Sequence, residues 1–152
     1  MDKEIFVKRL IEIINSIIKH IWNDFNEKDI INIKKLLKDL RISYHDCLYA
    51  IFYMFKIKPK IIDLNKNDKI EEKYILNSGY YMFLGALMNA YEYRRKKEIN
   101  INEIKIIMNI DEKEILLIKT TFIEFINKEL IIKDQIFNKL LQIIEKRIKQ
   151  NI

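Results

Sequence analysis

The sequence predicts an all-α fold, and its composition and its apolar spacing both lead to that expectation. The chain has 152 residues, of which 49% are hydrophobic and 33% charged, with only two glycines and one proline. A β-rich fold needs many more turn-forming residues, and a disordered or collagen-like chain is poor in large apolar residues or rich in glycine. Apolar residues recur at spacings of three and four, which is the spacing of one helix face. The length fits a single domain over residues 1–152.

The N-terminal part predicts two amphipathic helices. From about residue 4 to 24, apolar side chains repeat at helical spacing between polar ones, starting at Phe6 and continuing to Ile21. We assign residues 1–26 to this N-terminal helix. A shorter amphipathic segment covers residues 29–41 and opens the predicted core of the domain, residues 28–130.

A nearly all-apolar helix is predicted over residues 44–56. Ser43 and Asp46 have the spacing of a helix N-cap and its reciprocal partner. A helix that is apolar almost all round is usually central and buried. Pro59 and the polar run 63–68 are expected to form the longest loop.

A long helix is predicted next, over residues 70–97. Its middle contains small residues to which other helices could pack closely: Gly79, Gly85, Ala86 and Ala90. Each glycine there lowers helix propensity by up to about 1 kcal/mol, which is tolerable if a neighbour packs against that face.

Three further helices complete the prediction. A short one covers residues 102–109, and Asp111 with Glu114 opens another that ends near residue 129. Asp134 is expected to cap a last amphipathic helix, within a C-terminal segment of residues 133–152. No internal repeat or interdomain linker interrupts this order.

Charge and cysteine content limit the class of protein. The net charge of +6 is mildly basic, short of the segregated basic stripe of a dedicated nucleic-acid binder, so nucleic acid is an unlikely partner. The single Cys47 fits a reducing compartment, so we expect an intracellular protein, in the nucleus, the cytoplasm or both. No apolar stretch is long enough to cross a bilayer, so no membrane association is expected. One cysteine and two distant histidines predict no metal site.

Few residues favour catalysis. The sequence has no glycine-rich phosphate loop and no recognisable Ser-His-Asp or Cys-His set, so we expect neither an enzyme nor a cofactor. The basic run 94–97 has two interpretations. It could contact phosphate or an acidic partner, or its cations could stabilise a helix C-terminus, and we favour the second.

The order of the predicted helices resembles the cyclin box. The stretch SYHDCLYAIFYMF resembles the second helix of the box, YYMFLGALMNAYEY the third, and NIDEKEILLIKTTFIEFINKEL the fifth. Together with the leading helix FVKRLIEIINSIIKHIWNDF, the similarity covers most of the chain and is nearest to P-type (phosphate-system-like) cyclins. It implies a single cyclin-box-like five-helix bundle with an additional N-terminal helix and a C-terminal helix.

The resemblance also implies an interaction site. Cyclins carry a Lys on the third helix paired with a Glu on the fifth, at the centre of the kinase-binding surface. The matching positions here are Glu92 and Lys119, 27 residues apart and with the charges exchanged. An exchanged pair can still attract, so we expect the two helices to meet there. Tyr93, Ile123 and Leu130 complete the expected partner-binding residues.

The function implied is that of a non-catalytic regulatory subunit that binds and activates a cyclin-dependent protein kinase, and so acts as a kinase regulator in the cell cycle. Two alternatives remain from the residues. One is a basic helical module of cyclin-like fold that binds nucleic acid or another protein, and the other is a homo-oligomeric helical bundle. A steep salt dependence of binding would favour the nucleic-acid module.

Overall fold

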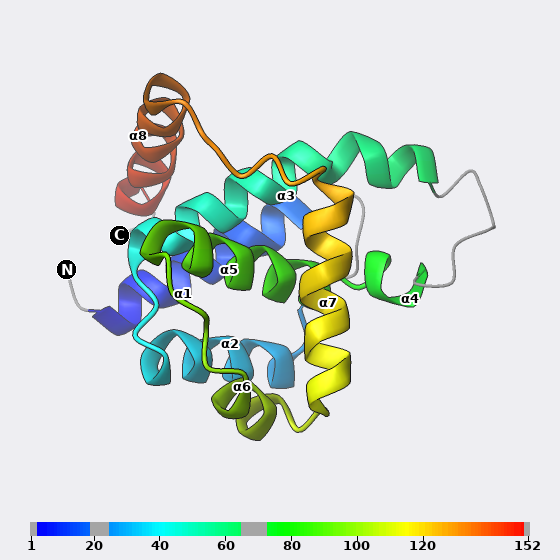
Figure 1. The fold of residues 1–152 in the computed structure, drawn as a ribbon. Helices are drawn as coiled ribbons and strands as arrows, with labels where there is room; N and C mark the ends of the chain where they lie inside the picture. Colours follow the sequence, from blue (N-terminus) through cyan, green and yellow to red (C-terminus); the bar gives the residue numbers. More distant parts are fainter. Residues whose placement is uncertain (1–2, 19–24, 65–72, 151–152) are drawn as a thin grey trace.

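The computed structural model is all-helical over the residues it describes, 3–18, 25–64 and 73–150, which confirms the predicted fold class (Figure 1). These ranges contain eight helices and no strand. The helices are α1 (Lys3–Ile18), α2 (Glu27–Asp39), α3 (Tyr44–Leu64), α4 (Lys73–Leu76), α5 (Gly79–Arg95), α6 (Ile101–Met108), α7 (Glu112–Phe125) and α8 (Asp134–Gln150). Residues 19–24, the predicted end of the first helix, and the side chains of Phe6 and Ile17 lie outside the described part.

The predicted helix starts agree with the structure where a side chain caps the backbone. Ser43 Oγ accepts a hydrogen bond from the Asp46 N–H, and the Asp46 carboxylate accepts one from the Ser43 N–H. Asp111 Oδ1 likewise accepts from the Glu114 N–H at 3.0 Å. α8 differs slightly, because Asp134 is its first helical residue and not the cap. Capping depends on neighbours in sequence, which makes it readable without the fold.

The loop predicted at Pro59 is wrong, because α3 continues through this residue to Leu64. Residues 65–68 of the predicted polar run lie outside the described part. A proline inside a helix costs about 3 kcal/mol, through a lost hydrogen bond and a steric clash. Ile57 and Ile61, on either side of Pro59, are buried at 0% and 1% exposure. Burying each of them contributes about 1.5–3 kcal/mol, which offsets the cost of the proline.

The single long helix predicted over 70–97 is also wrong, because the structure has two helices, α4 and α5, in this range. Ser78 has extended backbone, and its Oγ caps α5 by accepting from the Tyr81 N–H at 3.1 Å. Gly79 is therefore the first residue of α5 and not part of a helix middle. Residues 70–72 lie outside the described part. The end of α7 also differs from the prediction, because this helix stops at Phe125 and not near residue 129.

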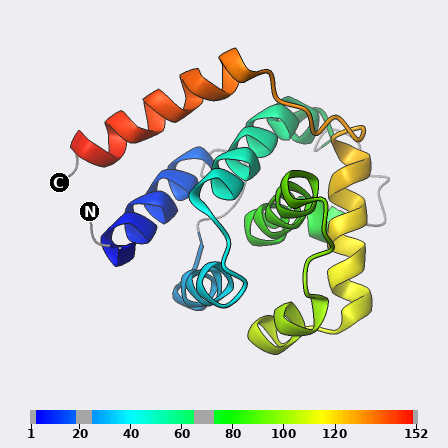
Figure 2. The same cartoon turned by 60° about the vertical axis from the view of Figure 1, so that its left-hand side comes forward.

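α5 occupies the centre of the molecule, packed against α3 on one side and α7 on the other (Figures 1 and 2). Every residue from Met82 to Tyr91 is buried, whereas α3, predicted to be central, exposes Phe55 on its outer side. Buried side chains from α1 to α8 form one hydrophobic core. In both views α8 lies on the outside, across α1 and the first half of α3.

α5 and α7 cross at Gly85, as expected for a small residue under a close neighbour. A Cβ atom at Gly85 would lie 2.8 Å from Phe122 Cβ and 3.2 Å from the Ile118 carbonyl oxygen. Ile118 and Phe122 are both fully buried at this crossing. The absence of a side chain at Gly85 therefore sets how closely the two helices approach.

Within the described ranges, no helix is long and apolar enough to cross a membrane.

Candidate functional site

Glu92 and Lys119 form an ion pair between α5 and α7. Lys119 Nζ lies 2.5 Å from Glu92 Oε1, and the two side chains are 25% and 18% exposed. The contact predicted between positions 92 and 119 is therefore present in the structure. The pair lies near the surface, where water reaches both charges.

Three hydrogen bonds hold this pair and its two helices in place. The second carboxylate oxygen of Glu92 accepts from the Ile99 N–H at 3.0 Å, which ties α5 to the segment before α6. The buried Asn89 side chain donates to the Gly85 carbonyl at 2.8 Å and to the Lys119 carbonyl at 3.2 Å, so it joins the backbones of α5 and α7. Sequence analysis missed Asn89, although an amide within an otherwise apolar helix was a visible signal, since buried polar groups need partners.

Tyr93 lies on the side of α5 that faces α3. It is 38% exposed, and its ring centroid is 6.4 Å from that of Tyr49. Tyr49 in turn packs edge-on against Tyr53 at 6.1 Å. The Tyr53 hydroxyl donates to the Leu130 carbonyl at 2.7 Å, and burial raises the pKa of this hydroxyl, so it stays a donor. These contacts connect Tyr93 to Leu130 through α3.

Ile123 and Lys119 share one side of α7, because they are four residues apart. Ile123 is half-buried, and Leu116, three residues before Lys119, is 41% exposed on the same side. An apolar stripe therefore borders the ion pair.

The structure places Glu92 and Lys119 in direct contact, with Ile123 beside Lys119 and with Tyr93 and Leu130 along the α3 side. Sequence analysis missed Leu116.

The segment after α7 is attached to α3 by two lysines that sequence analysis also missed. Lys60 Nζ donates to the Phe125 carbonyl at 3.2 Å, where the helix leaves its last carbonyls without backbone partners. Lys56 Nζ lies 2.9 Å from the Glu129 carboxylate and donates to the Glu129 carbonyl. These bonds position Leu130. Their partners are 65 and 73 residues apart in sequence, so no local pattern indicated them.

α8 borders the same region through Phe137. The Phe137 ring lies 4.9 Å from Tyr49 and 5.8 Å from the exposed His45, between ring centroids. Cys47, two residues after His45, is buried, and burial raises the pKa of its thiol. The His45 side chain is thus exposed to solvent and the Cys47 thiol is buried, so the two form no nucleophile–base pair.

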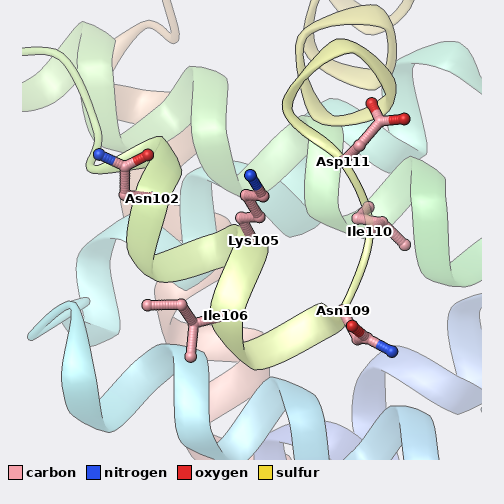
Figure 3. Close-up of a pocket in the computed structure, with 6 residues that line it drawn as sticks. All are labelled: Asn102, Lys105, Ile106, Asn109, Ile110 and Asp111. Atoms are coloured by element: carbon pink, nitrogen blue, oxygen red, sulfur yellow. The ribbon is translucent and has the colours of Figure 1, made fainter.

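An open pocket of about 580 Å³ lies elsewhere, on α6 and the turn into α7 (Figure 3). Its lining is Asn102, Lys105, Ile106, Asn109, Ile110 and Asp111, and none of these was predicted as a site residue. Within residues 3–18, 25–64 and 73–150, no group of three or more His, Cys, Asp or Glu could hold a metal ion.

Comparison with known proteins adds no relative: no protein-family model, no curated protein and no solved structure matches the chain.

Proposed function

We propose that this protein is a non-catalytic, cyclin-like regulatory subunit that binds a protein kinase of the cyclin-dependent class and activates it. The observation that supports the proposal most is the ion pair between Glu92 on α5 and Lys119 on α7. These are the two positions at which the resemblance puts the signature pair of the family. α5 and α7, which the resemblance matches to the third and fifth helices of the box, pack directly against each other, as the pairing of these positions requires.

The mechanism of such a subunit is a shift of population. A kinase needs an aligned Lys–Glu pair and a metal-binding Asp for phosphoryl transfer. A subunit with higher affinity for the aligned conformer increases its population by that difference in affinity. No chemistry by the subunit is required, and the interface supplies the free energy.

The residues around the pair have the character of such an interface. Tyr93 and Leu116 are exposed, and Ile123 and Leu130 are half-buried. Leu116 and Ile123 lie on the same side of α7 as Lys119, whereas Tyr93 and Leu130 lie toward α3. Aromatic and aliphatic anchors inside a polar rim are typical of protein interfaces. A permanent complex would bury about 2,000 Å² or more, so these residues would form its centre rather than its whole area.

The first test is co-purification. The tagged protein is recovered from its native cell, and the expected result is a cyclin-dependent-type kinase whose activity rises with the amount of added subunit. Recovery without any kinase, or a kinase whose activity is unchanged, would remove the support for this function.

The second test exchanges the charges of the pair. Glu92→Lys should weaken kinase binding by about tenfold, because two cations then face each other at the centre of the surface. Adding Lys119→Glu should restore part of the affinity. Restoration stays incomplete because a lysine cannot accept the hydrogen bond that Ile99 N–H now donates to Glu92.

The matched control is Lys113→Glu, which makes the same charge change as Lys119→Glu at an exposed position of α7 on a different side from Lys119. Kinase affinity should stay within about twofold of wild type for this variant. If the double variant binds no better than the weaker single variant, Glu92 and Lys119 do not act as a pair in kinase binding.

A further inference from the structure

The C-terminal end of α5 carries a basic cluster, defined here as Arg41, Arg94, Arg95, Lys96 and Lys97. All five residues are exposed. Arg41 follows the end of α2, whereas the other four lie at the end of α5 or directly after it. Arg95 Nη2 donates to the Arg41 carbonyl oxygen at 2.8 Å, which holds the ends of α2 and α5 together. The cluster therefore combines two segments that are far apart in sequence.

A single buried carboxylate orients the two neighbouring guanidiniums. Asp46 is 0% exposed, its Oδ1 pairs with Arg94 Nη1, and its Oδ2 pairs with Arg95 Nη2 at 3.0 Å. Burial by itself raises the pKa of Asp46, but the Ser43 N–H and the two guanidiniums outweigh it and keep the pKa below its usual value. Asp46 thus stays ionised and fixes both arginines.

Two tyrosine rings support the same arginines. Arg94 Cζ lies 5.3 Å from the ring centroid of Tyr49, and Arg95 Cζ lies 4.3 Å from that of Tyr91. Both are cation–π contacts, which restrain the guanidinium planes. The entropy lost when an anion binds is smaller for side chains that are already ordered.

The oriented arginines keep donors for another partner. A guanidinium has five N–H donors, and the ion pairs and hydrogen bonds of each arginine to described residues use one terminal nitrogen, Nη1 of Arg94 and Nη2 of Arg95. Lys96 and Lys97 have no ion pair with any described residue. The cluster is thus only partly satisfied by the protein.

The balance of charge also remains positive. Five cations face the carboxylates of Asp46 and Glu98 and the partial negative charges at the ends of α2 and α5, about half a unit each. An excess of about two positive charges remains. Stabilisation of helix ends therefore explains only part of the cluster.

From these observations we propose that the basic cluster is a docking surface for an acidic protein segment, whose carboxylate or phosphate groups bind the free guanidinium donors and the two lysines. A nucleic acid fits less well. Single strands are bound through base stacking on open aromatic faces, whereas the rings of Tyr49 and Tyr91 already carry a guanidinium. The surface adjoins Glu92 and Tyr93 along α5, so both could be used by one assembly.

The test measures fluorescence anisotropy of a labelled short peptide rich in glutamate and phosphoserine, titrated with the full chain. Comparison probes are a glycine–serine peptide of equal length and a single-stranded RNA. The variant Lys96→Glu/Lys97→Glu removes the lysines and leaves the contacts of Asp46 intact. Its control is Lys34→Glu/Lys35→Glu, which changes the net charge equally at two exposed positions of α2.

We expect the acidic peptide to bind and the glycine–serine peptide not to bind. Affinity should fall about tenfold or more in the Lys96→Glu/Lys97→Glu variant and stay within about twofold in the α2 control, once each variant shows the wild-type melting curve. Equal losses in both variants, absence of peptide binding, or tighter binding of RNA than of peptide would each overturn the proposal. Because no kinase is present, this result is independent of the kinase-binding test.

Discussion

Gly85→Ala tests the packing that brings Glu92 and Lys119 together. Two effects of opposite sign compete at this position. Alanine raises helix propensity in α5 by about 1 kcal/mol relative to glycine. Its Cβ would also lie 2.8 Å from Phe122 Cβ and 3.2 Å from the Ile118 carbonyl oxygen.

The steric effect should be the larger one. Carbon atoms in contact normally lie about 3.5–4.0 Å apart, so α5 and α7 have to separate by roughly 1 Å. The atom in the way is a Cβ on a helix backbone, which cannot rotate aside as a side-chain end could. Overpacking of this kind costs about 1–3 kcal/mol. After subtraction of the gain in helix propensity, we expect a net loss of up to about 2 kcal/mol in the free energy of unfolding. For a chain of this length that corresponds to a melting temperature lower by up to about 8 °C.

The assay is urea denaturation followed by circular dichroism, with the melting temperature as a second measure. Thr120→Ala, at an exposed position of α7, serves as the control, because it raises helix propensity without a new contact and should stabilise by about 0.5 kcal/mol. A Gly85→Ala protein that is more stable than wild type would refute the reasoning, since the steric cost at the crossing would then be smaller than the gain in helix propensity.

Two further predictions concern the buried end of α3. Asp46→Asn should lower the free energy of unfolding at pH 7 by about 2–3 kcal/mol, because Arg94 and Arg95 lose their shared anion. The pKa of Asp46 is lower in the folded chain, so its contribution is complete above about pH 4 and is lost as the pH falls through the folded pKa. The difference in free energy of unfolding between wild type and Asp46→Asn, measured by urea denaturation from pH 7 to pH 2, should become smaller as the pH falls. A difference that stays constant would contradict the lowered pKa of Asp46. Cys47 should react with Ellman's reagent only on unfolding, because burial raises the pKa of the thiol. Absorbance at increasing urea checks this, and fast labelling of the native protein would count against it.

Local features of this chain were readable from the order of residues. The capping bonds of Ser43 with Asp46 and of Asp111 with Glu114 join residues three apart, and apolar spacing marks one face of a helix. Both depend on interactions within a turn or two, which the sequence specifies directly. The Glu92–Lys119 contact needed more: it was predicted from spacing combined with resemblance to a family, and the structure contains it.

The error at Pro59 arose where long-range packing competes with local preference, whereas the division of residues 70–97 into two helices rests on the local cap at Ser78. Pro59 opposes a helix, yet burial of its neighbours Ile57 and Ile61 keeps α3 intact. The partners of Asp46, at positions 94 and 95, lie 48 and 49 residues away, and those of Lys60 and Tyr53 farther still. Such contacts depend on how helices cross, and the crossing results from the whole core. Helix starts marked by a cap are therefore encoded locally, whereas the continuation of α3 through Pro59 and the environment of each charge depend on how the helices pack.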